Sequence, residues 1–207
     1  MKKNPFILLL CISFQWLLAQ CNDGEIELWD NCYGIDITYE LNLSGQGLSG
    51  GIPNTIAQLS NLMFLDLSNN NLEGIIPQEI VSMETLLGFN LSHNSLTGGI
   101  PEELGNLTNL MSMDLSHNQL SGTVPSSIGN MTGLVEISLD HNLLSGELPI
   151  EIGQLMFLSE FLANLIALHG RRPCVICEIL MQKCSYLYWQ EPPRSNSQGA
   201  RNDPHFR

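Results

Sequence analysis

Two groups of side chains have types and spacing that could support chemistry. Three histidines, His93, His117 and His141, recur every 24 residues, and Asp140 precedes the last of them. Neutral imidazoles and a carboxylate are ligands for transition metals, and neighbouring imidazoles repel one another once protonated near pH 6. The same histidines, however, occupy an LSHN or LDHN segment that recurs along the chain. We therefore interpret them as members of a repeat and predict no metal site.

The second group lies towards the carboxyl end of the chain. Cys174 and Cys177 have CxxC spacing, and Cys184 and His169 are close in sequence. Such a set can hold zinc or form a redox pair. No second CxxC and no thioredoxin-like βαβ pattern accompanies it, and an exported chain favours disulfides. The GxSxG, HExxH and P-loop motifs are also absent. We expect neither an enzyme nor a bound cofactor.

Most of the chain follows one period of 24 residues with no insertion. The proline column is Pro53, Pro77, Pro101, Pro125, Pro149 and Pro173, and the asparagine column is Asn70, Asn94, Asn118 and Asn142. Glycines from Gly50 to Gly170 and leucines from Leu43 to Leu139 keep the same interval. Several columns with one spacing indicate stacked structural repeats.

Elementary geometry explains the columns. Alternating leucines in LxLxxN point to one face of a short strand, and such strands pair in parallel about 4.8 Å apart. A buried asparagine amide can satisfy backbone groups of neighbouring turns. Glycine suits a positive φ, and proline fixes φ and removes a donor. The apolar column that should close the core from the opposite side is Ile56, Ile80, Leu104, Ile128 and Ile152.

Each unit runs LxxLxLxxNxLxGxIPxxI, as residues 62–85 show. This pattern resembles the leucine-rich repeat, and its GxIP segment is similar to the plant-type subclass, over residues 38–181 or six units. The resemblance implies an α/β-type leucine-rich-repeat solenoid. Such a solenoid is a right-handed curved coil with a parallel β-sheet on its concave face and short 3-10 or irregular segments on its convex face. The concave face is the family's usual binding surface.

The flanking segments have separate interpretations. Residues 1–20 fit a signal peptide, with a basic start and an apolar run from Phe6 to Leu18. Residues 21–37 fit an N-terminal cap in which Trp29, Tyr33 and Ile35 cover the first unit. The sixth unit departs from the repeat pattern and is expected to form a C-terminal cap. Disulfides among Cys174, Cys177 and Cys184 could stabilise it. Residues 182–207 lose the period and are expected to be a flexible tail, or the product of a shifted frame in a longer repeat protein.

Cys21 and Cys32 form the natural disulfide pair, because the WDNCYG run looks like the N-terminal cap of plant-type repeats. The run LAQC ending at Cys21 also resembles a bacterial lipobox, and a lipid on this cysteine would exclude the disulfide. We expect a secreted, extracellular protein, with attachment to the cell surface through that lipid as the alternative. No segment has the roughly 20 apolar residues that a membrane span needs.

The charge distribution limits the partners. The formal net charge is −13, and no lysine or arginine lies between residues 4 and 170. An acidic body repels phosphate backbones, so we expect no nucleic-acid partner. A cationic peptide, a polar glycan or a partner bridged by calcium fits better.

The positions between the strand leucines should line the concave face in columns. One column is Glu40, Phe64, Gly88, Ser112, Glu136 and Glu160; the next is Asn42, Asp66, Asn90, Asp114 and Ser138; the third is Ser44, Ser68, Ser92, Ser116 and Asp140. With His93, His117 and His141, these columns supply the candidate ligand-binding residues. In a eukaryotic host, Asn42, Asn90, Asn106 and Asn130 are also glycosylation acceptors.

These features predict an extracellular module that recognises a protein, peptide or glycan through its concave face. Two alternatives stay open: a structural or adhesive surface protein, and a truncated receptor-like ectodomain that lacks its kinase. An enzyme or metalloprotein based on His169 and the segment from Cys174 to Cys184 is a further alternative, and it requires stoichiometric metal in the purified protein.

Overall fold

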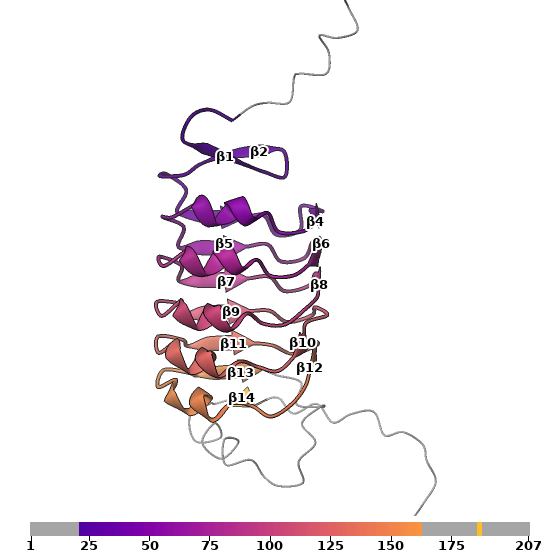
Figure 1. The fold of residues 1–207 in the computed structure, drawn as a ribbon, viewed down its shortest axis with the longest axis vertical. Helices are drawn as coiled ribbons and strands as arrows, with labels where there is room; N and C mark the ends of the chain where they lie inside the picture. Colours follow the sequence, from indigo (N-terminus) through magenta and orange to yellow (C-terminus); the bar gives the residue numbers. More distant parts are fainter. Residues whose placement is uncertain (1–20, 163–185, 188–207) are drawn as a thin grey trace, which may run out of the picture.

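The computed structural model describes residues 21–162 and 186–187, and these residues form the coil that the repeats predict (Figure 1). The proposed signal peptide, His169 and the cysteines Cys174, Cys177 and Cys184 lie outside the described residues. Within the described part, no helix is long and apolar enough to cross a bilayer.

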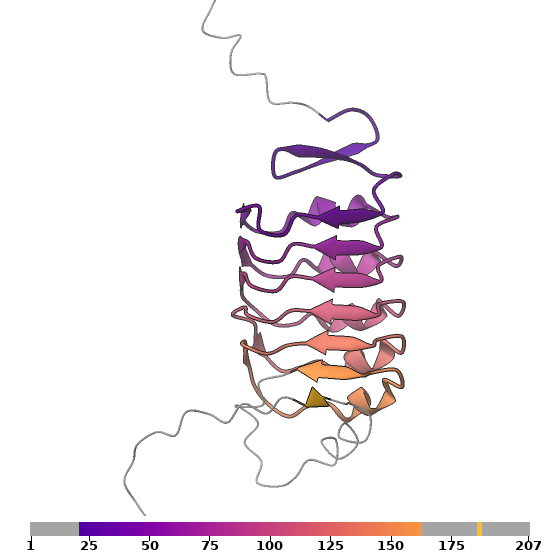
Figure 2. The same cartoon turned by 180° about the vertical axis from the view of Figure 1, so that it is seen from behind.

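A parallel sheet of seven short strands lines one side of the coil (Figure 2). The strands, in order along the sheet, are β3 (Glu40–Asn42), β5 (Phe64–Asp66), β7 (Gly88–Asn90), β9 (Ser112–Asp114), β11 (Glu136–Ser138), β13 (Glu160–Leu162) and β14 (Tyr186–Leu187). From β3 to β13 each residue pairs with its equivalent one repeat later, as Leu41 does with Leu65. The repeat period therefore fixes the register of the sheet.

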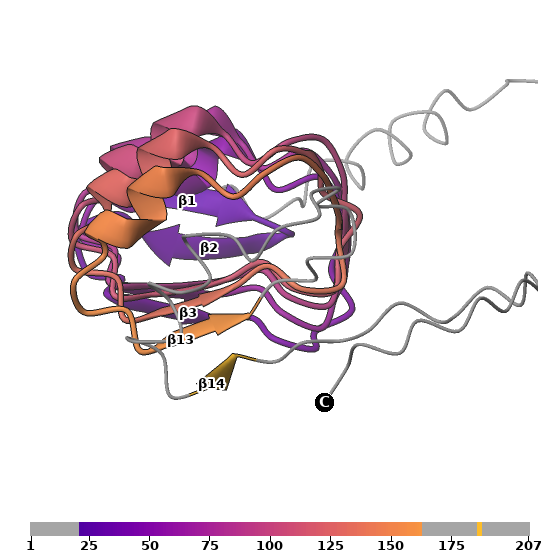
Figure 3. The same ribbon diagram turned by 90° about the horizontal axis from the view of Figure 1, so that it is seen from below.

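The opposite side carries a stack of 3-10 helices, which Figure 3 shows facing the strands. They are η1 (Asn54–Gln58), η2 (Gln78–Ser82), η3 (Glu102–Asn106), η4 (Ser126–Asn130) and η5 (Ile150–Gln154). A proline of the proline column precedes each helix, with φ between −59° at Pro101 and −70° at Pro125. The predicted apolar column from Ile56 to Ile152 is buried in these helices and closes the core.

A third side joins the sheet to the helices through very short parallel strands. These are β4 (Ser49–Gly50), β6 (Asn71–Gly74), β8 (Ser95–Leu96), β10 (Ser121–Gly122) and β12 (Leu143–Leu144). The glycine column turns the chain here: from Gly50 to Gly146 its members have φ between 78° and 83°. Only glycine adopts this left-handed conformation without steric cost, so the predicted role of the column is confirmed.

The asparagine column ties each turn to its neighbours. The amide of Asn118 donates to the carbonyl oxygens of Leu91, Leu115 and Ser116 at 3.0–3.2 Å, and its Oδ1 accepts from Leu96 N–H at 3.0 Å. Asn70, Asn94 and Asn142 repeat this arrangement. The predicted structural role of these residues is confirmed.

An antiparallel hairpin covers the N-terminal end of the coil (Figure 1). Its strands are β1 (Glu25–Leu28) and β2 (Asn31–Gly34), joined by a two-residue turn at Trp29 and Asp30, which both have positive φ. Ile26 and Leu28 are buried in the core, while Trp29, Tyr33 and Ile35 pack against it and stay partly exposed. The sequence identified the partly exposed residues and missed the two buried ones.

The disulfide between Cys21 and Cys32 is present, with the two Cα atoms 5.4 Å apart. It uses the sulfur that a lipid on Cys21 would need. Tyr33, next to the bond, has a pKa above the ordinary tyrosine value because it is partly buried.

We expect Cys32→Ser to lower the free energy of unfolding by about 2–3 kcal/mol, since it frees a short loop of the unfolded chain. Urea unfolding followed by circular dichroism measures the change. Cys21→Ser is the matched control and should cost the same, because each variant loses the same bond. Equal stability of wild type and both variants would show that the bond adds nothing to the cap.

The structure corrects the prediction of a flexible tail at two residues. Tyr186 and Leu187 form β14, which pairs in parallel with Glu160 and Phe161 of β13. The unpaired edge of β13 offers backbone donors and acceptors, and an aromatic and apolar segment has the propensity to pair with it. The offset along the chain is 26 residues instead of 24, so the period search did not detect this strand.

Candidate ligand-binding face

The outer face of the seven-stranded sheet holds a groove of about 790 Å³. Strands β3 to β13 line it, and its floor follows the stacked strands seen in Figure 2. The first two predicted columns meet in this groove: Glu40, Asn42, Phe64, Asp66, Gly88, Asn90, Ser112, Asp114, Glu136, Ser138 and Glu160 all line it.

The groove is acidic and has no internal counter-charge. Glu40, Asp66, Asp114, Glu136 and Glu160 supply the carboxylates. No lysine or arginine occurs between residues 4 and 170, so none is available within residues 21–162 to neutralise them. One glutamate carboxylate of the groove makes little contact with the protein, since Glu136 accepts a hydrogen bond only from Ser112 Oγ, at 3.4 Å. Such a surface attracts positively charged partners.

The second column also shapes the end of each strand. The Oδ1 atom of Asp66 accepts from Ser68 N–H at 2.9 Å, and Asp114 does the same with Ser116 N–H. Asn42 and Asn90 make the equivalent bond in their own repeats. Aspartate and asparagine are therefore interchangeable for the fold at this position, and they differ in the charge that they bring to the groove.

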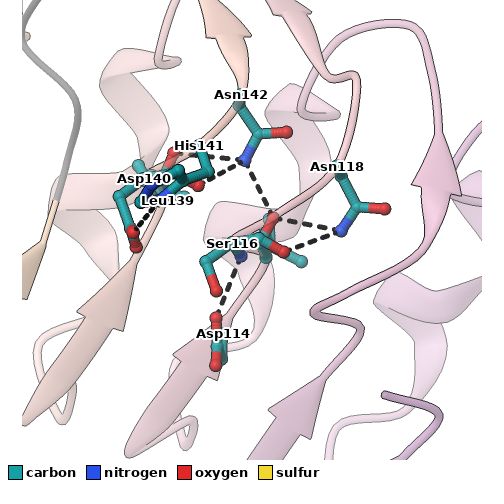
Figure 4. Close-up of polar contacts among 8 residues, drawn as sticks. Asp114, Ser116, Asn118, Leu139, Asp140, His141 and Asn142 are labelled. Carbon is teal, nitrogen blue, oxygen red and sulfur yellow. Dashed lines mark hydrogen bonds and ion pairs between the residues drawn. The ribbon is translucent and has the colours of Figure 1, made fainter. Parts of the chain in front are cut away.

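The predicted exposure of the third column is wrong for most of its members. Ser68, Ser92 and Ser116 are 3%, 4% and 6% exposed. They come two residues after the last strand residue, where the chain already turns into the coil, and their side chains are buried there (Figure 4 shows Ser116 beside Asp114). Asp140, the acidic member of the column, is 22% exposed.

A row of apolar side chains borders the groove, and the sequence reasoning missed it. Its members precede each strand by one residue and are Tyr39, Met63, Leu87, Met111 and Val135. Tyr39 and Met111 are 56% and 49% exposed, although both are large and mainly hydrophobic. The signal was available, because the first variable position of LxxLxL is apolar in five consecutive repeats. We call these five residues the apolar row.

Phe64 extends the apolar character from this row into the groove. Its side chain is 47% exposed and lies over Gly88 of the next strand. A Cβ atom on Gly88 would come within 2.8 Å of Phe64 Cδ1, so the absence of a side chain at Gly88 leaves room for the ring in this position. The groove therefore combines exposed apolar and aromatic side chains with carboxylates, and Phe64 stands in the same column as Glu40 and Glu136.

The histidine column, His93, His117 and His141, lies just beyond the strands, outside the groove lining. Each histidine has φ between 52° and 54°. The rings stack, with 4.0 Å between the centroids of His93 and His117 and the same between His117 and His141. The pKa of His117 lies below the ordinary histidine value, first because of partial burial and then because of its two histidine neighbours.

The four glycosylation acceptors fall on different faces. Asn42 and Asn90 line the groove, where a glycan would compete with any ligand. Asn106 and Asn130 are exposed at the ends of η3 and η4, on the opposite side of the coil.

Comparison with protein families gives two matches. The family described as "Leucine rich repeat" matches residues 89–144, and a second description, "Leucine Rich Repeat", matches residues 61–83. Comparison with curated proteins gives no match.

Several solved structures share the fold. The ectodomain of the Arabidopsis receptor kinase SOBIR1 is 30% identical with a TM-score of 0.58, and the match covers 69% of this chain and 81% of that one. The Arabidopsis receptor kinase HAESA, solved with the peptide hormone IDA and the co-receptor SERK1, is 34% identical with a TM-score of 0.61, over 63% of this chain and 22% of that one. A TDR receptor is 42% identical with a TM-score of 0.55, over 56% and 21%. The chain thus spans about a fifth of the TDR and HAESA structures.

Proposed function

Because the chain belongs to the plant-type leucine-rich-repeat family, we propose that it is an extracellular binding module whose groove holds a positively charged peptide segment with apolar side chains. The segment lies across the strands from β3 to β13. Its basic side chains meet the groove carboxylates, and its apolar side chains meet Phe64 and the apolar row.

One observation carries this proposal: carboxylates and exposed apolar side chains line or border the same groove. A peptide that carries both basic and apolar side chains can contact both kinds of group. Large exposed apolar patches beside polar residues are typical of interaction sites. A neutral glycan does not need the carboxylates, and a purely structural spacer does not need exposed Met111 or Phe64.

One similar structure supports a peptide ligand: HAESA is solved with a peptide hormone. The chain spans about a fifth of that structure, so we expect a short ligand segment or a second protein that completes the site. A structural or adhesive surface protein remains the alternative, and it predicts no ligand that depends on the groove.

The test neutralises three carboxylates of the groove without disturbing the fold. Asp66→Asn and Asp114→Asn place the residue that Asn42 and Asn90 already have at this position, and Glu136→Gln completes the triple variant. Linear peptides are selected on the wild type from a displayed library. We expect basic and apolar residues to be enriched and the triple variant to bind the selected peptides about 3- to 150-fold more weakly, because three exposed ion pairs of roughly 0.2–1 kcal/mol each sum to about 0.6–3 kcal/mol.

The matched control removes the same charge elsewhere. Glu73→Gln, Glu84→Gln and Glu147→Gln neutralise three exposed carboxylates away from the groove, and this variant should bind like the wild type. Calorimetry at two salt concentrations should show weaker binding at higher salt for the wild type and this control, and a smaller effect of salt for the triple variant. Selected peptides that bind all three proteins equally would refute recognition through the groove.

A further inference from the structure

Three metal-ligating side chains converge at one rim of the sheet, outside the groove. One ligand atom from each of His117, Asp140 and His141 lies within 4.8 Å of the other two. All three side chains are at least partly exposed, so a hydrated ion can reach them. Figure 4 shows Asp140 and His141 directed at one another beside the turn that follows β11.

The backbone holds the two turns that carry these residues. His117 N–H donates to the carbonyl oxygen of Asp140 at 2.9 Å, and Asn118 N–H donates to that of His141 at 3.1 Å. Both histidines have a positive φ, so each side chain leaves its turn in the same direction. The separation of the imidazoles is therefore set by the coil, and only side-chain rotation is needed to adjust it.

The separations allow a bound metal ion once the side chains rotate. The rings of His117 and His141 are 4.0 Å apart and 10° from parallel. Two nitrogens on one tetrahedral Zn²⁺ are about 3.3 Å apart, given Zn–N bonds of roughly 2.0–2.1 Å, and their lone pairs must point at the same ion. Nearly parallel rings do not meet this condition, so binding requires the imidazoles to turn out of the stack. His141 Nδ1 and Asp140 Oδ2 lie 2.5 Å apart in a hydrogen bond, which an ion would replace as the two atoms separate to about 3.3 Å.

The ligand set also departs from the repeat at one position. Serine occupies this position in four repeats, as Ser44, Ser68, Ser92 and Ser116, and Asp140 occupies it in the fifth, next to two stacked histidines. Partial burial, and then its two histidine neighbours, lower the pKa of His117, which favours the neutral imidazole that binds metals.

We propose that His117, Asp140 and His141 bind one divalent transition-metal ion of the Zn²⁺ class. From the sequence alone, the histidines were interpreted as ordinary repeat positions. The structure adds that one ligand atom from each of the three side chains lies close to the other two. The site joins the turns after β9 and β11, so a bound ion links two adjacent repeats and adds positive charge to an acidic body. This proposal is independent of the peptide groove.

Isothermal titration of the full chain with Zn²⁺ tests the site, using replacements that the repeat itself supplies. His117→Asn and His141→Asn introduce the residue that Asn69 places in the same left-handed conformation, with φ 55°. Asp140→Ser restores the residue of the other repeats. Each variant should lose one Zn²⁺ equivalent, or bind it at least tenfold more weakly. His93→Asn is the control, because His93 is not one of the three ligands, and it should keep that equivalent.

Thermal unfolding provides a second measurement, because an ion that binds the folded chain raises its melting temperature. Zn²⁺ should raise the melting temperature of the wild type and His93→Asn more than that of the other three variants. Zn²⁺ bound by residues outside 21–162 is common to all five proteins and cancels in the comparison. Equal numbers of Zn²⁺ equivalents and equal affinities in the wild type, His117→Asn and His141→Asn would overturn the proposal.

Discussion

Asn118→Ala should lower the free energy of unfolding by about 3–5 kcal/mol. The side chain is 8% exposed and makes four hydrogen bonds to backbone groups of two consecutive turns. Alanine leaves those groups without these partners in a place that water does not reach, and each buried unpaired group costs about 1–3 kcal/mol. Chemical unfolding monitored by circular dichroism measures the loss.

Two further variants separate the contributions at this position. Gln119→Ala, at the exposed neighbouring residue, should change stability by less than about 0.5 kcal/mol. Asn118→Asp keeps an acceptor for Leu96 N–H but brings a carboxylate next to three carbonyl oxygens, so it should be at least as damaging as alanine. A loss below about 1 kcal/mol for Asn118→Ala would mean that water replaces the amide and that the column is not the internal tie of the coil.

Gly105→Ala should destabilise the protein by about 3 kcal/mol, although alanine is ordinarily the better helix former. Gly105 lies in η3 against η4, and an added Cβ would come within 2.2 Å of the Ser127 carbonyl oxygen. Backbone cannot rotate away as a side chain can, so the two helices must separate. Overpacking of this kind costs about 1–3 kcal/mol, and more where backbone must move.

Gly99→Ala is the matched control, since its added Cβ would meet nothing closer than the Ser121 carbonyl oxygen at 3.7 Å. Its φ is not positive, so alanine fits, and stability should change by less than about 1 kcal/mol. Melting temperatures of the two variants provide the comparison. If Gly105→Ala melts at or above the wild-type temperature, the close approach of η3 and η4 is not a constraint on the fold.

The sequence was sufficient for the fold because nearly every structural role recurs with the period. A column of identical residues reports a shared environment, and buried Leu65, the asparagine column and the glycine column were each assigned correctly from it. The hairpin was harder, because residues 21–37 occur once. Nothing in their pattern distinguishes buried Leu28 from partly exposed Trp29 before the strand pairing is known.

The candidate site was only half predictable. The two acidic and polar columns were placed correctly because they alternate with buried strand leucines. Ser68 was misplaced because the alternation stops where the strand ends, and a sequence does not show whether that happens one or two residues after Asp66. The apolar row was overlooked because Met63 and Leu87 look like core residues until the core is seen to be complete without them.

The change of strand direction at the N-terminal end has a consequence for association between molecules. Strands stacked at a constant spacing could template the addition of another coil, and so build a fibre end to end. Among the described residues, the stack of parallel strands ends here. β3 is the terminal strand of its sheet, and the antiparallel hairpin beyond it, which precedes β3 in the chain, forms a separate two-stranded sheet. Its disulfide also prevents the hairpin from opening to present a parallel edge.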